Sequence, residues 1–253
     1  MKFTFLGTGT SMGVPVAGGF KRELLAHDPR NERTRCSAWI ETPEISLLID
    51  VGPEFRIQSI RSGIQKLDYI LITHEHMDHI GGIDDLRMYN YINKKPLPVY
   101  TSKRCKESIE RRFDYMFGED KYPGSTSLDL RVIESSVTLG DLNITPLPVN
   151  HGSLEILGFR INNLVYLTDV KSIPESTKSL ITGCDVLIIS ALREEPLHPT
   201  HLTIPEAVAL VEELGNPQSY LIHMNSSVIH QETNISLPPN VRLAYDMLTF
   251  ETD

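Results

Sequence analysis

Three histidines and an aspartate lie within six residues of this sequence, at His74, His76, Asp78 and His79. The apolar run 67–72, rich in β-forming residues, precedes them and predicts a buried strand. Histidines two residues apart point the same way only on extended or loop backbone, so His74 and His76 can bind one metal ion. Asp78 and His79 can bind a second ion as the chain turns into a helix. Imidazole and carboxylate ligands suit Zn²⁺, Mn²⁺ or Fe²⁺, whereas a solvated polar loop rarely concentrates ligands so densely.

Three more residues of metal-ligand type close predicted strands much later in the chain, at His151, Asp169 and His223. In α/β proteins the chemistry usually lies where strands end. Each of these residues alone would be an ordinary turn or core residue, but the set completes two metal sites. Three ligands serve one ion (His74, His76 and His151), three serve another (Asp78, His79 and His223), and the Asp169 carboxylate can bridge both.

The elements that must position these side chains are mostly strands. Strands are predicted at 2–6, 36–41, 45–50, 67–72, 96–100, 130–134, 137–139, 142–149, 156–161, 164–168, 185–190, 219–222, 241–245 and 248–251. Helices are predicted at 53–62, 78–91, 103–113, 174–182 and 203–214. One plan, a β-rich stretch followed by a site loop and a helix, occurs twice. We therefore expect one α/β (α+β) domain over 1–253, with two sheets covered by helices on their outer faces.

Composition is that of an ordinary globular protein, with 253 residues, 40% hydrophobic and 23% charged. The net charge of −9 argues against a long nucleic-acid footprint, which usually needs a basic face. It does not exclude a small anionic substrate held by metal ions. The sequence therefore favours a small substrate and no long nucleic acid.

The cysteines and the N-terminus bear on the compartment. Cys36, Cys105 and Cys184 are far apart with no CxxC pair, so they predict neither a disulfide framework nor a zinc knuckle. The apolar run 1–6 is too short for a signal peptide, and no run nears the roughly 18 apolar residues of a membrane helix. We expect a reducing, cytoplasmic compartment and no membrane partner.

Three loops are notable. The glycine-rich stretch 7–15 has the spacing GxGxxxG rather than GxGxxG, so it predicts a close-packed turn near a site rather than a nucleotide-binding loop. Segment 16–35 is polar and irregular, which fits a solvated loop or a lid over the site. Segment 114–127 carries several aromatic residues, which can line a substrate pocket or fill a subunit interface; the interface is favoured.

The ligand order resembles that of the metallo-β-lactamase-fold hydrolases, whose motif is HxHxDH followed by a distant His, a distant Asp and a final His. All are matched in order, over essentially the whole chain. The resemblance implies a four-layer αββα sandwich with a two-metal site, and Asp50 matches an aspartate that supports the ligands from behind. The diiron branch that reduces oxygen and nitric oxide has Glu at the place of His76, so hydrolysis is favoured over redox chemistry.

Three longer segments, FLGTGTSMGVP, HMDHIGGIDDLR and HPTHLTIPEA, resemble the phosphodiesterase branch of that superfamily. The branch includes tRNA 3′-processing endonucleases and the phosphoribosyl cyclic phosphodiesterase of phosphonate breakdown. The second likeness is closer, because the glycine/proline-rich arm with which the tRNA enzymes grip tRNA is absent. In this branch a histidine before the late helix contacts the phosphate and assists the leaving group; His201 matches it, with His198 as the alternative.

One departure from the phosphonate-type pattern concerns a structural zinc. Many such members hold it with cysteines just after SMGVP and a histidine three residues after the last metal histidine. Here residues 16–20 contain no cysteine and the later position is Ser226. No structural zinc is therefore expected, and the likeness says less about the exact substrate.

The resemblance implies a hydrolase with two divalent metal ions that cleaves a small phosphodiester, cyclic or linear, by attack of a metal-bound hydroxide. His201 would donate a hydrogen bond to the phosphate or a proton to the departing alkoxide, and Asp78 would help orient the hydroxide. The alternatives are a thioester or β-lactam hydrolase on the same fold and a catalytically silent metal-binding module. A homodimer is expected from the family and from the aromatic loop.

Overall fold

The computed structural model describes residues 1–19, 28–118, 121–122 and 124–252. Its strands are β1 (Lys2–Gly7), β2 (Ser37–Glu41), β3 (Ser46–Ile49), β4 (Tyr69–Leu71), β5 (Leu97–Thr101), β6 (Leu128–Val132), β7 (Val137–Leu139), β8 (Leu142–His151), β9 (Leu154–Ile161), β10 (Leu164–Leu167), β11 (Val186–Ser190), β12 (Gln218–Ile222), β13 (Val241–Leu243) and β14 (Thr249–Glu251). Its helices are α2 (Phe55–Ser62), α3 (Met77–Ile80), α4 (Arg87–Asn93), α5 (Lys103–Arg112), α6 (Glu175–Ile181), α7 (Ile204–Glu213) and α8 (His230–Ser236), with 3₁₀ turns η1 (Pro29–Asn31), η2 (Ile83–Leu86) and η3 (Asp114–Met116).

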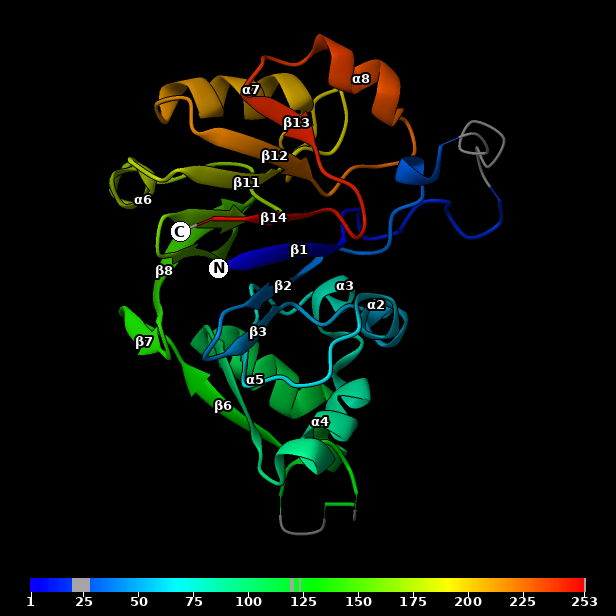
Figure 1. The fold of residues 1–253 in the computed structure, drawn as a ribbon, viewed down its shortest axis with the longest axis vertical. Coiled ribbons are helices and arrows are strands. Elements are labelled where there is room, and N and C mark those ends of the chain that lie inside the picture. The colour runs from blue at the N-terminus through cyan, green and yellow to red at the C-terminus, as the bar shows by residue number, and fades with distance from the viewer. Residues whose placement is uncertain (20–27, 119–120, 123, 253) are drawn as a thin grey trace.

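Within these residues the strands form two seven-stranded sheets (Figure 1). The first has the order β14-β1-β2-β3-β4-β5-β6 and the second the order β13-β12-β11-β10-β9-β8-β7. Strands β3 to β6 run parallel to one another, as do β10 to β13. β8 runs in the same direction as β10, because both are antiparallel to β9. The carboxyl ends of β4, β8, β10 and β12 therefore lie where ligands are expected to meet.

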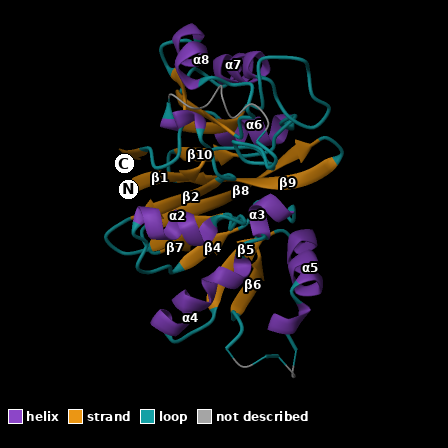
Figure 2. Cartoon of the chain, turned by 90° about the vertical axis from the view of Figure 1, so that its right-hand side faces the viewer, coloured by secondary structure: helices purple, strands orange, loops and turns teal. Residues whose placement is uncertain are grey.

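The core is divided by the alternation of side chains along each strand. In β3, Leu47 faces the other sheet and Leu48 faces the helices outside. In β11, Ile188 faces the other sheet and Leu187 faces the helices outside. Both faces of each sheet are thus buried, which is why the strands are apolar along their length. Helices α2, α4 and α5 cover one outer face and α6, α7 and α8 the other (Figure 2). The predicted four-layer αββα sandwich is confirmed.

The predicted helix over 78–91 was wrong. Instead α3 ends at Ile80, η2 follows, and α4 begins at Arg87. The helix breaks at Gly82, whose N–H donates to the Val51 carbonyl at 2.8 Å. A Cβ on Gly82 would clash with the Gly52 carbonyl oxygen, so glycine permits the close approach of these two segments.

Helix α8 was not predicted at all. It has no side-chain N-cap. Its first residue is instead fixed by a residue far away in the sequence, since the His230 N–H donates to the Asn31 Oδ1 at 2.7 Å. The predicted loops at 16–35 and 114–127 fall partly on residues 20–27, 119–120 and 123, which lie outside the described residues. Of the helices that are described, none is long and apolar enough to cross a membrane.

Candidate metal centre

The segment after β4 brings His74 and His76 together on extended backbone. His76 has φ −69° and ψ 148° and precedes α3. The Nε2 of His74 and the Nδ1 of His76 lie 3.0 Å apart. Two nitrogens that bind the same Zn²⁺ at about 2.0–2.1 Å in a tetrahedral site are about 3.3 Å apart. The separation therefore fits two ligands on a single ion.

A second group of ligand atoms, from Asp78, His79, Asp169 and His223, lies within 4.8 Å of one another. The Nε2 of His79 lies 3.2 Å from the Asp78 Oδ2, and the Nε2 of His223 lies 3.1 Å from the Asp169 Oδ1. Both Nε2 atoms are buried, and within the described chain neither has a hydrogen-bond partner. Because buried polar atoms are normally satisfied, this donor set fits a cation that all four ligands would contact.

The two carboxylate oxygens of Asp169 point toward different groups. Its Oδ2 lies 3.8 Å from the His74 Nε2, while its Oδ1 lies 3.4 Å from the His79 Nε2. Asp169 also belongs to every group of ligand atoms found in the described chain. This geometry fits a carboxylate that bridges two ions.

His151, the last residue of β8, completes the cluster from the other sheet. Its Nδ1 donates to the Thr200 carbonyl at 2.9 Å, because a carbonyl can only accept. The lone pair of a neutral ring then lies on Nε2, as a metal ligand requires. The ring centroid lies 5.3 Å from that of His76 and 5.8 Å from that of His74, but its ligand atom groups with those of Asp169 and His201 rather than with the His74–His76 pair.

Asp50 supports the cluster from behind, in the place that its motif position indicated. Its buried carboxylate accepts from the Thr73 N–H and hydroxyl, each at 2.8 Å, and from the His79 Nδ1 at 2.7 Å. This contact turns the Nε2 of His79 toward the other ligands. Thr73 is a residue that sequence reasoning missed, although its place directly before the first histidine is a usable signal.

The backbone is strained at three residues of the site. Asp50, Asp169 and His223 have φ values of 58°, 54° and 62°. This left-handed region costs a residue with a side chain about 1–2 kcal/mol, and Asp and His are among the residues that occupy it most readily. Each of them follows the end of a strand, so the turn redirects its side chain into the cluster.

Burial and neighbouring charges shift the pKa values of several of the candidate ligands. Burial, helped by neighbouring imidazoles, lowers the pKa of His74 and His76. Burial raises the pKa of Asp78 and Asp169, but nearby imidazoles more than offset it, so both carboxyl pKa values fall below the ordinary value. Burial lowers the pKa of His79, yet the surrounding carboxylates bring it well above its ordinary value. A cation would displace the proton of His79, between carboxylates that are already ionised.

His201 faces the same space from the segment before α7. Its ring centroid lies 4.7 Å from that of His151 and 4.8 Å from that of His223. Its Nδ1 is buried without a hydrogen-bond partner in the described structure. Burial, and then the charge of His223, lower the pKa of His201 to about 3. The ring of the alternative residue, His198, lies next to that of His201, with 4.9 Å between the ring centroids.

The glycine-rich stretch 7–15 packs behind the last ligand. Gly9 forms isolated parallel β-bridges with Arg35 and with Met224, and the Met224 N–H donates to the Thr8 carbonyl at 3.1 Å. Met224 directly follows His223, so this stretch supports a ligand as a close-packed turn.

Two packed sheets, helices on their outer faces and a His/Asp cluster where strands end define a hydrolase of the metallo-β-lactamase fold. Residues 46–224 match the family described as beta-lactamase superfamily domain. A crystal structure described as a new diphosphatase from the PhnP family superposes with a TM-score of 0.91, at 34% identity over 100% of this chain and 98% of that one. The chain therefore belongs to the β-lactamase superfamily and, within it, to the PhnP family. The resemblance noted in the sequence is confirmed.

Curated relatives match over a smaller share of their own length. The octanoyltransferase of Porphyromonas gingivalis is 39% identical over 252 residues, which are 98% of this chain and 51% of that protein. The exodeoxyribonuclease YycJ of Bacillus anthracis is 25% identical over 162 residues, 60% of this chain and 57% of that protein. The chain thus spans about half the length of these relatives.

Proposed function

We propose that the protein is a dinuclear-metal-dependent hydrolase that cleaves a small phosphodiester. The observation that carries this proposal is the set of three groups of ligand atoms that share Asp169, one of which joins His151 to His201. His74, His76 and His151 would hold one ion, and Asp78, His79 and His223 the other. The ligand set suits Zn²⁺ or Mn²⁺, with Fe²⁺ as a third choice.

The metal ions, when bound, would acidify a water molecule and offset the negative charge of the phosphate. The protein's own groups would place the substrate. Asp78 has one carboxylate oxygen toward His79 and an exposed fraction of 11% for its side chain. It can therefore accept a hydrogen bond from a water molecule that enters from its exposed side and so orient that water for in-line attack.

His201, which stacks against His223 and lies beside His151, would bind the phosphate. With its pKa lowered to about 3, the ring is neutral at pH 7 and has one N–H to donate. A bound phosphate anion would favour the protonated ring, and the same histidine could then donate a proton to the leaving oxygen. Such general acid assistance typically contributes about 10²–10⁴-fold.

The names of two relatives support cleavage at phosphorus, since one is a diphosphatase and another an exodeoxyribonuclease. The net charge of −9 favours a small substrate over a long nucleic acid. The cytoplasmic location predicted from the separated cysteines stays a prediction; in the described chain all three thiols are free and buried.

Acyl chemistry is the second candidate, because the octanoyltransferase relative aligns with nearly all of this chain. That alignment leaves about half of the relative outside it, which is room enough for a separate domain to carry the transfer. A thioester hydrolase on this fold would use the same ligands. The two candidates therefore have to be separated by substrate.

The test measures metal content and turnover on the same preparation. The metal-loaded protein is assayed with bis(p-nitrophenyl) phosphate, with an octanoyl thioester and with a chromogenic β-lactam. We expect two ions per chain and turnover of the phosphodiester alone. Two bound ions with thioester or lactam turnover and no diesterase activity would refute the proposal, and two bound ions with no turnover of any of the three would indicate a silent metal-binding module.

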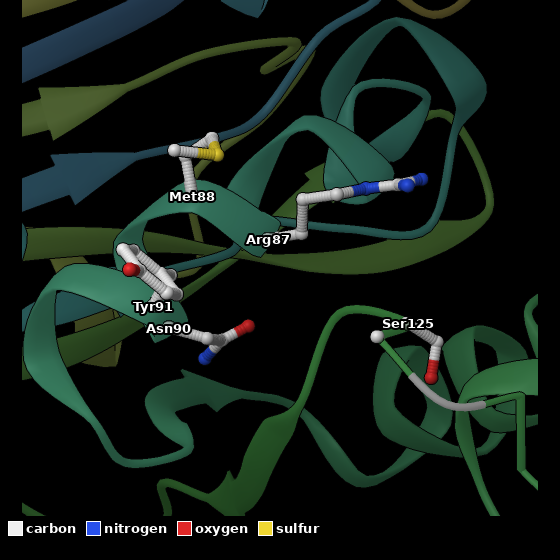
Figure 3. Close-up of a pocket in the computed structure, with 6 residues that line it drawn as sticks. Arg87, Met88, Asn90, Tyr91 and Ser125 are labelled. Atoms are coloured by element: carbon white, nitrogen blue, oxygen red, sulfur yellow. The ribbon is translucent and has the colours of Figure 1, made fainter.

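We also propose that the protein forms a homodimer through the exposed face of α2 and α4. Ile60, Met88, Tyr91 and Ile92 are exposed there by 50–78%. Figure 3 shows Met88 and Tyr91 on α4, across from Ser125, around a hollow of about 530 Å³. The residues that line this hollow come from η2–α4 and from Gly124 and Ser125. Contiguous exposed apolar side chains of this kind usually mark an interface.

A further inference from the structure

Thr73 lies directly before the first histidine of the metal centre, and all of its polar atoms form hydrogen bonds. Its N–H donates to the Asp50 Oδ1 at 2.8 Å, and its carbonyl accepts from the Leu157 N–H of β9 at 3.1 Å. Asp50 follows a strand of the first sheet, whereas β9 belongs to the second. The backbone of Thr73 is therefore held by both sheets, and its buried hydroxyl can bind only its immediate neighbours.

The Thr73 hydroxyl has two such neighbours. Its Oγ1 lies 2.8 Å from the Asp50 Oδ2 and 3.0 Å from the His74 Nδ1. A hydroxyl has one proton to donate, whereas an ionised carboxylate can only accept. The hydroxyl therefore donates to Asp50 and accepts from His74, because the opposite arrangement would set the lone pairs of two oxygens against each other. The proton of the neutral His74 ring then lies on Nδ1, and the lone pair of its Nε2 is free.

The Nε2 of His74 faces other candidate ligands. It lies 3.0 Å from the His76 Nδ1 and 3.8 Å from the Asp169 Oδ2, and the three residues form one group of ligand atoms. A histidine that binds a metal ion through one nitrogen normally donates a hydrogen bond from the other. The Thr73 hydroxyl is the acceptor for that hydrogen bond.

The same oxygen of Asp50 also holds a histidine of the second ligand group. The His79 Nδ1 lies 2.7 Å from the Asp50 Oδ2, so this oxygen accepts from His79 and from the Thr73 hydroxyl. One buried carboxylate thus orients a histidine in each of two ligand groups, His79 by direct contact and His74 through the hydroxyl. All four residues are exposed by 1% or less, so water has no access to replace a missing partner.

We propose that Thr73 is a positioning residue for the ion that His74 and His76 would hold, and that it acts by transmitting the charge of Asp50 to the His74 ring. The inference takes the two ions from the proposed function but does not depend on the reaction. Without the hydroxyl, the His74 Nδ1–H would lose its acceptor, which favours the ring with its proton on Nε2. That proton would occupy the lone pair that the ion needs. The direct contact between Asp50 and His79 would remain, so the second ion would keep its ligand.

Thr73→Val tests this proposal, because valine replaces the hydroxyl with a methyl group and keeps the backbone contacts. Loss of a partner that orients a metal-binding histidine weakens metal affinity by about 10–100-fold. We expect that loss for the ion at His74 and an unchanged affinity for the other ion. Thr73→Ser keeps the hydroxyl and should restore wild-type affinity. Thr101→Val is the matched control, since Thr101 is equally buried and its hydroxyl donates to the Ile72 carbonyl at 2.9 Å; it should change neither affinity.

Affinities are measured by titrating the metal-free proteins with Zn²⁺ in competition with a chromophoric chelator. Two further backgrounds identify the ion that is affected. His223→Ala removes a ligand of the second group, and in that background Thr73→Val should still weaken the remaining ion. His76→Ala removes a ligand of the first group, and in that background Thr73→Val should leave the remaining ion unaffected.

A measurement on the wild type does not depend on the folding of any variant. In the Zn²⁺-loaded protein, ¹⁵N NMR should show a proton on the His74 Nδ1 that exchanges slowly with water, because the Thr73 hydroxyl accepts from it. Rapid exchange of this proton would overturn the proposal.

Three results of the titrations would also overturn it: wild-type affinity for both ions in Thr73→Val, an equal loss in Thr101→Val, or no recovery in Thr73→Ser. Equal weakening of both ions by Thr73→Val would likewise contradict an effect that passes through His74. Two bound ions with the expected pattern and no phosphodiester turnover would refute the proposed function and leave the role of Thr73 standing. A wild type that binds no ion would overturn both.

Discussion

Asp50→Asn is the most informative single change at the metal centre, because it alters a group that no ion contacts. An asparagine can still accept from Thr73 with its Oδ1. The Asp50 Oδ2, which accepts from the His79 Nδ1 at 2.7 Å, would become an NH₂ group that faces another N–H. The clash favours the ring with its proton on Nε2, and that places a hydrogen on the nitrogen that lies 3.2 Å from the Asp78 Oδ2. The second ion would then lose a ligand.

The size of the effect follows from the ordinary strength of such outer contacts. Loss of a partner that orients a metal-binding histidine weakens metal affinity by about 10–100-fold, which corresponds to about 1.4–2.7 kcal/mol. Bound metal stabilises the fold by mass action, so the same free energy should disappear from the metal-induced stabilisation. For a chain of this length, a shift of about 2–4 °C in Tm per kcal/mol gives about 3–11 °C.

The assay is thermal unfolding of wild type and variant, each as metal-free protein and at a buffered free Zn²⁺ concentration. We expect Asp50→Asn to be less stable than the wild type without metal, because the buried carboxylate that faces the protonated His79 is lost, and we expect its gain in Tm with metal to be smaller as well. The control is Asp246→Asn, since this carboxylate also accepts four hydrogen bonds, from Thr8 and Thr34. That variant should lower stability with and without metal alike. A full wild-type gain in Asp50→Asn, with two ions bound at wild-type affinity, would refute the reasoning.

Three other predictions concern separate parts of the molecule. His201→Ala should lower kcat on bis(p-nitrophenyl) phosphate by about 10²–10⁴-fold while metal analysis still finds both ions; unchanged turnover would exclude the role given to this residue. Burial, followed by the neighbouring arginines, lowers the pKa of His230 to about 4 from an ordinary 6.5, so its neutral form contributes stability above pH 6.5 that is lost as the pH falls toward 4. Urea unfolding across this range should show a wild-type loss about 2–3 kcal/mol greater than that of His230→Gln, and parallel curves would contradict the assignment. Ile60→Glu should convert a dimer to a monomer in light scattering, whereas Ile235→Glu, at a site 79% exposed on α8, should not; a wild type that is monomeric throughout would count against the interface.

The strands and the clustering of the candidate ligands were predictable because both have short-range signals. The strands carry apolar runs bounded by turn residues, and His74, His76, Asp78 and His79 are close enough in sequence for spacing alone to indicate metal binding. Asp169 and His223 became recognisable because each closes a strand. Their left-handed backbone was not foreseen, since it results from the turn that the fold imposes after each strand.

Other features depend on contacts between distant segments and have no local signal. The break in the helix over 78–91 comes from the approach of Gly82 to Gly52, which only the packed structure reveals. His151 is oriented by the backbone carbonyl of Thr200, 49 residues away, and a carbonyl leaves no trace in residue type. Helix α8 lacks a side-chain cap and relies on a hydrogen bond to Asn31.

The central claim is that two ions, bridged by Asp169, make this chain a phosphodiesterase. The most direct measurement is a titration of the chelator-treated protein with Zn²⁺ or Mn²⁺, with bis(p-nitrophenyl) phosphate turnover recorded against metal bound per chain. Turnover should be absent without metal and should reach its maximum as the second ion binds. Binding of two ions per chain without any diester turnover would contradict the account.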